Sequence, residues 1–201
     1  WAKGEELVVL FARTGQGKSW VLAKTLTHAW QIGNRVGYIS PEMSPTKIGY
    51  RVDTLMKNFS NNNLVWGREE PNYDKHIEEL SKQERPFVVA TPLDFQKKIT
   101  VTKLKHFCQT HKLDILGIDG ITYLTDERYK KGDNKTITLT NISEDLSMLS
   151  IELGIPIIVV VQSNRSGVKN ADADGTPELE SIRDSDGIAH NATKVIALRQ
   201  T

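Results

Sequence analysis

At residues 12–19 the chain reads Ala12-Arg13-Thr14-Gly15-Gln16-Gly17-Lys18-Ser19. An apolar run at residues 7–11 precedes this segment, and a helix-like pattern at residues 19–31 follows it. A strand, a glycine-bearing loop, a Lys-Ser pair and a helix make up the P-loop arrangement. In such a loop, successive backbone N–H groups curl around phosphate oxygens, and Gly15 and Gly17 leave space for that approach. The segment therefore predicts a site for nucleotide phosphates, with all eight residues as binding candidates.

The chemistry expected of this loop follows from its residue types. The N-terminus of the following helix adds positive potential where phosphates bind. Lys18 would reach the β- and γ-phosphates, and the Ser19 hydroxyl would bind magnesium. Ala12 stands where the common pattern has glycine, but a methyl group is the smallest intrusion, so we expect the loop to survive. A simple turn before an ordinary helix is the alternative, and the strand-to-helix context argues against it.

Composition limits the class of protein. The chain has 201 residues, of which 38% are hydrophobic and 25% charged, and its formal net charge is +1. These values fit one globular domain without a global basic field for nucleic acid. A single cysteine, Cys108, excludes an internal disulfide and favours a reducing compartment. No apolar run approaches membrane-spanning length. We expect a cytoplasmic protein without membrane contact, in the host cytoplasm if a phage encodes it.

Short apolar runs alternate with helical patterns along the whole chain. We expect strands at residues 7–11, 35–39, 87–90, 114–119, 155–161 and 194–198. We expect helices at residues 19–31, 44–59, 73–84 and 102–111, and a further helix that ends at Gly154, with loops at residues 60–63, 126–135 and 164–177. This alternation predicts an α/β fold, a mainly parallel twisted sheet with helices on both faces.

Ligands of such sheets bind at the carboxyl ends of the strands, so the residues that follow each strand are site candidates. Glu42 follows the second expected strand, Asp119 ends the fourth, and Gln162 follows the fifth. Asp119 would hold magnesium together with Ser19, and Glu42 would orient or deprotonate the attacking water. Gln162 would hydrogen-bond the γ-phosphate. A turn or capping acid at Asp119 and a surface acid at Glu42 are the simpler alternatives.

Taken together, four stretches resemble the RecA-like motor domain of DnaB-type hexameric replicative DNA helicases of bacteria and phages. Residues 12–19 are similar to that family's phosphate loop, and residues 40–44, Ser-Pro-Glu-Met-Ser, to its Ser-Leu-Glu-Met segment. Asp119 falls on its Walker-B acid, and residues 162–165 are similar to its Ser-Gln-Leu-Asn-Arg segment. The resemblance covers nearly the whole chain. It implies a RecA-like P-loop fold and a catalytic set of Glu42, Lys18 and Gln162.

A fifth stretch, residues 182–187, resembles the family's Leu-Arg-Glu-Ser-Gly loop, which lies along the central channel of the ring. By this resemblance, contacts to single-stranded DNA are implied for Arg183, Asp184 and Asp186, although Asp186 stands where the family has glycine. Lys130 and Lys131 in the charged loop are further candidates for phosphate contact. A charged loop at a helix entry and a solvated surface loop are the alternatives for the two segments.

The resemblance implies ATP and Mg²⁺ as cofactors. It implies single-stranded DNA, further copies of the chain in a hexameric ring, a primase and a helicase loader as partners. The family's arginine finger lies beyond Thr201, and its N-terminal domain is also absent. We therefore expect residues 1–201 to be one motor domain, a fragment that binds nucleotide but hydrolyses it slowly, since a missing finger costs about 10³–10⁵ in rate.

Two other functions fit part of the pattern. A RecA- or RadA-type recombination ATPase shares the core, but the Glu42-Met43 segment and the stretch at residues 163–165 favour the helicase. A nucleotide-gated DNA-binding scaffold without motor activity is the second alternative, and the acids at Glu42 and Asp119 argue against it. Polarity-dependent unwinding distinguishes the helicase from the first, and ATP turnover distinguishes it from the second.

Overall fold

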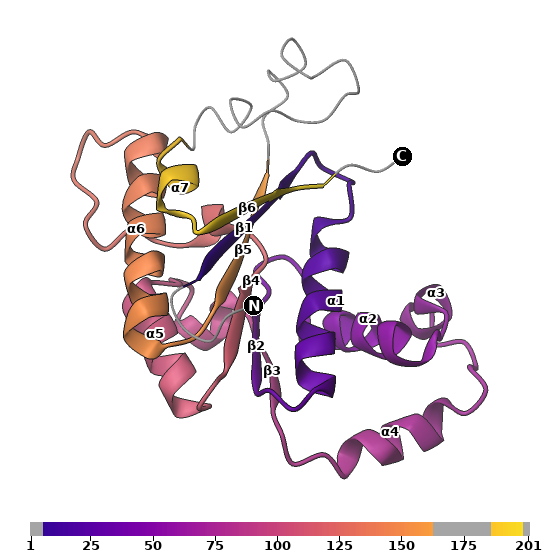
Figure 1. The fold of residues 1–201 in the computed structure, drawn as a ribbon. Helices are drawn as coiled ribbons and strands as arrows, with labels where there is room; N and C mark the ends of the chain where they lie inside the picture. Colours follow the sequence, from indigo (N-terminus) through magenta and orange to yellow (C-terminus); the bar gives the residue numbers. More distant parts are fainter. Residues whose placement is uncertain (1–5, 163–185, 199–201) are drawn as a thin grey trace.

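The computed structural model describes residues 6–162 and 186–198 of the chain (Figure 1). Within these residues, six strands form one sheet in the order β3-β2-β4-β5-β1-β6. Every neighbouring pair in the sheet is parallel, so the prediction of a mainly parallel sheet is confirmed. The strands are β1 (Leu7–Ala12), β2 (Val36–Ile39), β3 (Phe87–Ala90), β4 (Ile115–Ile118), β5 (Ile157–Gln162) and β6 (Lys194–Ala197).

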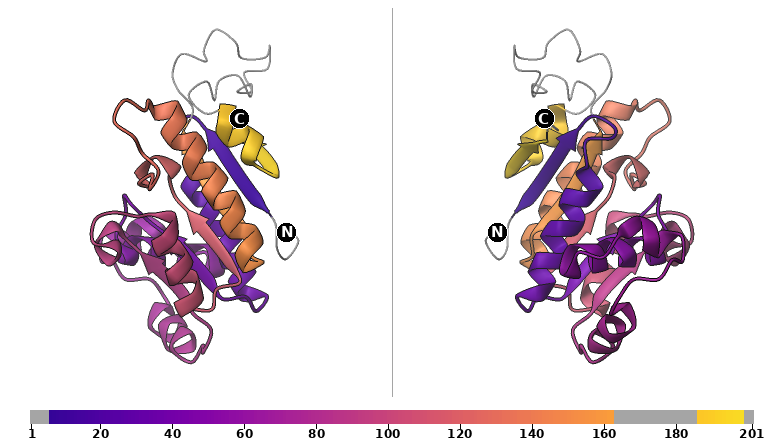
Figure 2. Two further views of the ribbon diagram at one scale, coloured as in Figure 1. Left: turned by 90° about the vertical axis from the view of Figure 1, so that its left-hand side faces the viewer. Right: turned by 90° about the vertical axis from the view of Figure 1, so that its right-hand side faces the viewer.

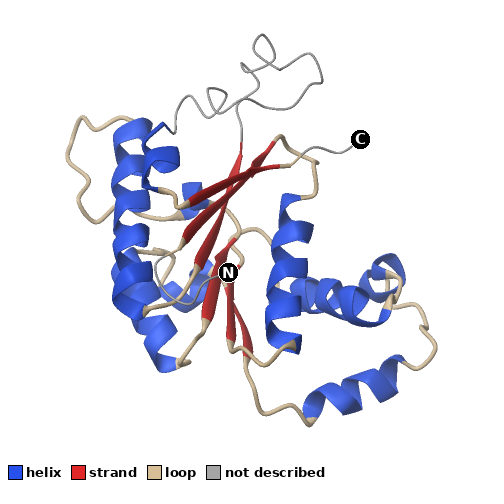
Figure 3. Ribbon diagram, viewed as in Figure 1, coloured by secondary structure: helices blue, strands red, loops and turns tan. Residues whose placement is uncertain are grey.

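Helices cover both faces of this sheet, as Figure 3 shows in blue against red strands. They are α1 (Lys18–Gln31), α2 (Pro45–Lys57), α3 (Asn61–Val65), α4 (Tyr73–Ser81), α5 (Val101–Thr110), α6 (Lys135–Leu153) and α7 (Asp186–Asn191), with 3-10 turns η1 (Pro92–Phe95) and η2 (Ile121–Tyr123). The two views of Figure 2 show α6 in front of one face and α1 in front of the other. None of these helices is both long and apolar enough to cross a membrane.

Alternating side chains of the central strand divide the core between the two faces. Leu7, Val9 and Phe11 of β1 belong to the cluster that packs against α5, α6 and α7. Val8 and Leu10 belong to the cluster that packs against α1 and α2. A strand buried on both faces has this continuous apolar pattern, which explains why residues 7–11 can be recognised from the sequence.

The structure corrects three details of the predicted elements. Residues 60–63, predicted as a loop, begin α3, because the Ser60 hydroxyl accepts a hydrogen bond from the backbone N–H of Asn63 and caps the helix. Helix α2 ends at Lys57, before the predicted residue 59, because Asn58 adopts the left-handed conformation with φ of 58°. The third difference is helix α7, which the sequence patterns do not predict.

A glycine in β4 sets how closely α1 approaches the sheet. A Cβ atom on Gly117 would lie 2.4 Å from Leu26 Cδ1 and 3.0 Å from Leu22 Cδ1. We expect Gly117→Ala to lower the free energy of unfolding by about 1–3 kcal/mol, because the core must shift to admit the methyl group. Urea unfolding would measure this loss. The matched control is Gly49→Ala in α2, where no heavy atom lies within 4 Å of the added carbon; equal losses in both variants would contradict the packing argument.

Candidate active site

The P-loop lies between β1 and α1, as the sequence predicts for a strand–loop–helix unit. Gly15 and Gly17 both have left-handed backbones, with φ of 81° and 77°. A Cβ atom at either position would meet nothing within 4 Å, so the conformation rather than a lack of space calls for glycine here. Helix α1 begins at Lys18 and points its N-terminus into the loop. The loop therefore has the shape and the dipole of an anion site.

Lys18 is held by the loop itself. Its Nζ donates hydrogen bonds to the carbonyl oxygens of Ala12 and Arg13, each at 2.7 Å. Burial lowers the pKa of the Lys18 ammonium, and the charges of Asp119 and Glu42 oppose that shift. These carboxylates therefore help to keep the ammonium charged at the mouth of the loop.

Asp119 and Ser19 form the pair that could hold a metal ion. The Ser19 hydroxyl donates to Asp119 Oδ1 at 3.0 Å, and the Tyr38 hydroxyl donates to Asp119 Oδ2 at 2.9 Å. Burial raises the pKa of the Asp119 carboxyl, while the two hydrogen bonds act in the opposite direction. Burial and the nearby Asp119 charge raise the pKa of the Tyr38 hydroxyl, so Tyr38 remains a donor. Hydroxyl and carboxylate oxygens are suitable ligands for Mg²⁺.

Glu42 lies on a turn between β2 and α2. The buried Ser40 hydroxyl shapes this turn: it donates to the Met43 carbonyl at 2.8 Å and accepts from the Met43 N–H at 3.3 Å. Helix α2 then begins with Ser44 as its cap and Pro45 at its first position. The side chain of Glu42 is exposed and accepts a hydrogen bond from the Tyr123 hydroxyl. This bond is the main cause of the raised pKa of the Tyr123 hydroxyl.

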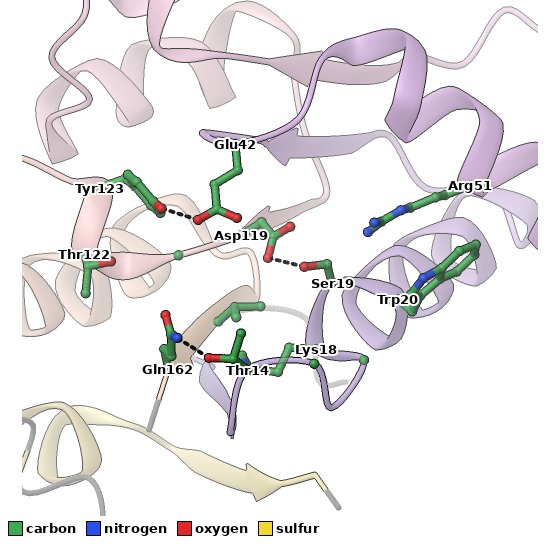
Figure 4. Close-up of a pocket in the computed structure, with 14 residues that line it drawn as sticks. Thr14, Lys18, Ser19, Trp20, Glu42, Arg51, Asp119, Thr122, Tyr123 and Gln162 are labelled. Carbon is green, nitrogen blue, oxygen red and sulfur yellow. Dashed lines mark hydrogen bonds between the residues drawn. The ribbon is translucent and has the colours of Figure 1, made fainter. Parts of the chain in front are cut away.

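These groups line one cavity of about 400 Å³ at the carboxyl ends of the strands (Figure 4). The predicted site residues that line it are Thr14, Gly15, Gly17, Lys18, Ser19, Glu42, Asp119 and Gln162. At the end of β5, the Gln162 side-chain amide donates to the Thr14 hydroxyl. Ala12, Arg13 and Gln16 belong to the loop without lining the cavity. The structure thus brings the predicted carboxylates, lysine and amide to one place.

Sequence reasoning missed several residues of this cavity. Arg51 of α2 stacks over the ring of Trp20 in α1, 5.0 Å from its centroid, and both residues line the cavity. Arg51 Nη1 is buried and has no hydrogen-bond partner among the described residues. Tyr123 is the other important omission, since it contacts Glu42 directly. These contacts join separate elements, so no local pattern signals them.

The residues predicted to contact DNA are not brought together with the cavity. Arg183 and Asp184 lie outside the described residues, and Asp186 begins α7. Lys130 and Lys131 are exposed in the loop before α6, where the Lys130 backbone N–H donates to Asp133 Oδ2 at 2.7 Å. Neither lysine lines the cavity. Their predicted role in DNA binding therefore stays a prediction.

Comparison with known proteins places this geometry in a family. The replicative DNA helicase DnaB of Helicobacter pylori strain ATCC 700392 / 26695 is 30% identical over 197 residues, which cover 96% of this chain and 39% of that protein. A probable plasmid replicative DNA helicase of Chlamydia psittaci is 26% identical over 196 residues, which cover 96% of this chain and 42% of that protein. The chain thus spans about two fifths of the length of these relatives.

Solved structures show the same fold. The ATPase domain of a phage helicase has a TM-score of 0.82 at 19% identity, and the match covers 97% of this chain and 69% of that one. A DnaB-like replicative helicase, described with its interactions with primase, has a TM-score of 0.73 at 20% identity and covers 96% and 46%. A sequence model of the DnaB-like helicase C terminal domain matches residues 2–201. The chain therefore belongs to the DnaB-like helicase C-terminal domain family.

Proposed function

We propose that this chain is the ATP-hydrolysing motor domain of a replicative DNA helicase. The single observation that carries the proposal is one cavity in which the Ser19–Asp119 pair, Lys18 and Glu42 meet. A hydroxyl and a carboxylate suited to magnesium, a lysine for phosphate oxygens and a carboxylate for water are the parts that phosphoryl transfer requires. Membership of the helicase family supports ATP as the nucleotide.

The described residues fit Mg²⁺ and a triphosphate. The Ser19 hydroxyl and the buried Asp119 carboxylate offer oxygen ligands, and the left-handed loop directs backbone N–H groups toward phosphates. When bound, Mg²⁺ would neutralise part of the charge on the phosphates. Lys18 would exchange its carbonyl partners for phosphate oxygens and stabilise the charge that develops during hydrolysis.

Three side chains would act on the water and on the phosphate that is released. Glu42 would accept a proton from the attacking water, or orient that water for an in-line attack. Arg51, with its unpaired buried Nη1 at the cavity, would add positive charge near the outer phosphate. Gln162, at the end of β5, would release Thr14 to hydrogen-bond the γ-phosphate, and its movement would report whether that phosphate is present.

The assembly we propose is a homo-hexameric ring around single-stranded DNA, in the cytoplasm. The names of the relatives and the primase interactions of one structural neighbour support DNA replication and a primase contact. A helicase loader completes the proposed partners. In this ring, the arginine finger of a neighbouring subunit would complete the cavity. Arg183, Asp184, Asp186, Lys130 and Lys131 would face DNA, and residues 1–201 would be one motor domain within a longer chain.

ATP turnover by the complete gene product, with and without single-stranded DNA, tests the proposal. We expect turnover that DNA stimulates and that removal of Mg²⁺ with a chelator abolishes, because the Ser19–Asp119 pair has no metal to hold. Turnover indifferent to DNA would contradict the helicase function and leave an ATPase with another partner. Strand exchange without directional unwinding would instead favour a recombination ATPase.

A further inference from the structure

The turn that follows β4 brings a tyrosine against the carboxylate of Glu42. Tyr123 is the last residue of η2, and its hydroxyl donates to Glu42 Oε1 (Figure 4). The backbone on either side of Tyr123 is anchored, because Ile121 is fully buried and Leu124 is 7% exposed. Tyr123 itself is 46% exposed, so burial in the core does not account for the position of its ring.

Gly120 makes the seat for this ring. A Cβ atom on Gly120 would lie 2.7 Å from Tyr123 Cδ2 and 3.0 Å from Tyr123 Cε2, closer than real side-chain contacts. Gly120 also has φ of 126°, which a residue with a side chain rarely adopts. The residue directly after Asp119 thus combines a special backbone with an open surface. Both features serve the placement of the Tyr123 ring beside the cavity.

Glu42 needs an external support. Its turn is fixed through the backbone of Met43, but the exposed Glu42 side chain can rotate about three bonds. Figure 4 shows Tyr123 reaching Glu42 from the side opposite to Ser19 and Lys18. Among the hydrogen bonds of the described residues, only Oε1 of Glu42 has a partner. The tyrosine therefore holds one oxygen from behind and leaves Oε2 to face the cavity.

We propose that Tyr123 is a positioning residue for Glu42, and that its hydroxyl fixes the carboxylate in the orientation needed to receive the proton of the attacking water. The inference rests on the proposed function, since it assigns a support to the base of that reaction. A carboxylate fixed before the reaction loses less conformational freedom when the water is aligned. Tyr123 touches neither nucleotide nor water in this scheme and acts only through Glu42.

Tyr123→Phe in the complete gene product tests this role, because it removes the hydroxyl and keeps the ring over Gly120. We expect kcat for ATP to fall about tenfold, the scale of one hydrogen bond to a charged group. We expect KM to change by less than about twofold, because no contact to ATP is lost. Tyr73→Phe is the matched control: it also deletes a tyrosine–carboxylate hydrogen bond, to Asp53 at 2.8 Å, but away from the cavity. That variant should keep kcat.

A double variant separates positioning from a purely structural effect. If Tyr123 acts through Glu42, adding Tyr123→Phe to Glu42→Gln should produce no further loss of turnover. An unchanged or raised kcat in Tyr123→Phe, or equal losses in both Glu42 backgrounds, would overturn the positioning role. Failure of the proposed function is distinguishable, because Glu42→Gln would then retain turnover by itself.

Discussion

Glu42→Gln is expected to lower ATP turnover by about 10²–10⁴-fold, the contribution typical of a positioned general base. Glutamine keeps the shape of the side chain and can still accept the hydrogen bond of Tyr123, but it cannot take up a proton. The P-loop contacts of Lys18 and the Ser19–Asp119 pair are untouched. ATP binding should therefore persist while kcat collapses. Steady-state turnover and equilibrium binding of ATP, both on the complete gene product, measure the two quantities.

The control for this change is Glu69→Gln, which makes the same substitution at an exposed glutamate that does not line the cavity. It should leave both turnover and binding unchanged. If Glu42→Gln lost ATP binding in parallel with turnover, Glu42 would be a binding group rather than the base. If turnover survived in Glu42→Gln, the base would have to be sought elsewhere in the cavity.

The second large effect concerns stability at the junction of α2 and α4. Asp53 of α2 is 5% exposed and lies 3.0 Å, through Oδ1, from Nε2 of the buried His76 of α4. The Tyr73 hydroxyl donates to the other oxygen of Asp53 at 2.8 Å. Phe59 packs against both the Tyr73 ring and the His76 ring. The cluster attaches α4 to the rest of the domain through one shared carboxylate.

Asp53→Ala should weaken the docking of α4 by about 3–5 kcal/mol, because it leaves Tyr73 and His76 with buried polar atoms and no partner. Hydrogen exchange of the α4 amides would report the loss directly, and urea unfolding would report any effect on the whole domain. Glu79→Ala is the matched control. It removes an ion pair with Lys57 at 3.7 Å that joins the same two helices, but both side chains are 52% exposed.

The control should change the free energy of unfolding by less than about 1 kcal/mol, since exposed ion pairs contribute little. Unaltered protection of the α4 amides in Asp53→Ala would show that apolar packing around Phe59 holds the helix alone. Equal losses in the two variants would assign the attachment to charge rather than to buried hydrogen bonding.

Much of the fold is readable from the sequence because its signals are local. The apolar run at residues 7–11 and the glycines of the loop identify the P-loop without any long-range contact. A single rule, that ligands bind at the carboxyl ends of parallel strands, then directs attention to Glu42, Asp119 and Gln162. The structure places all three at one cavity. Their chemical roles remain predictions that the substitutions above address.

The remaining parts of the site depend on geometry that the sequence does not display. Tyr38 lies inside β2 and resembles a core residue, yet its hydroxyl bonds Asp119 on the neighbouring strand. Tyr123 reaches Glu42 only because Gly120 adopts φ of 126°. Arg51 reaches the cavity across two packed helices. In each case a contact between distant residues depends on side-chain direction, which hydrophobic patterning does not encode.

The two hydrogen bonds of Lys18 have a consequence for how tightly a phosphate can be held. The Ala12 and Arg13 carbonyls act as an internal competitor, because an incoming phosphate must draw the ammonium away from both oxygens. Affinity then reflects an exchange of partners rather than a net gain of contacts, which limits product retention. The same carbonyls recapture the ammonium when phosphate leaves. Such a built-in rival would favour rapid turnover over tight storage of nucleotide.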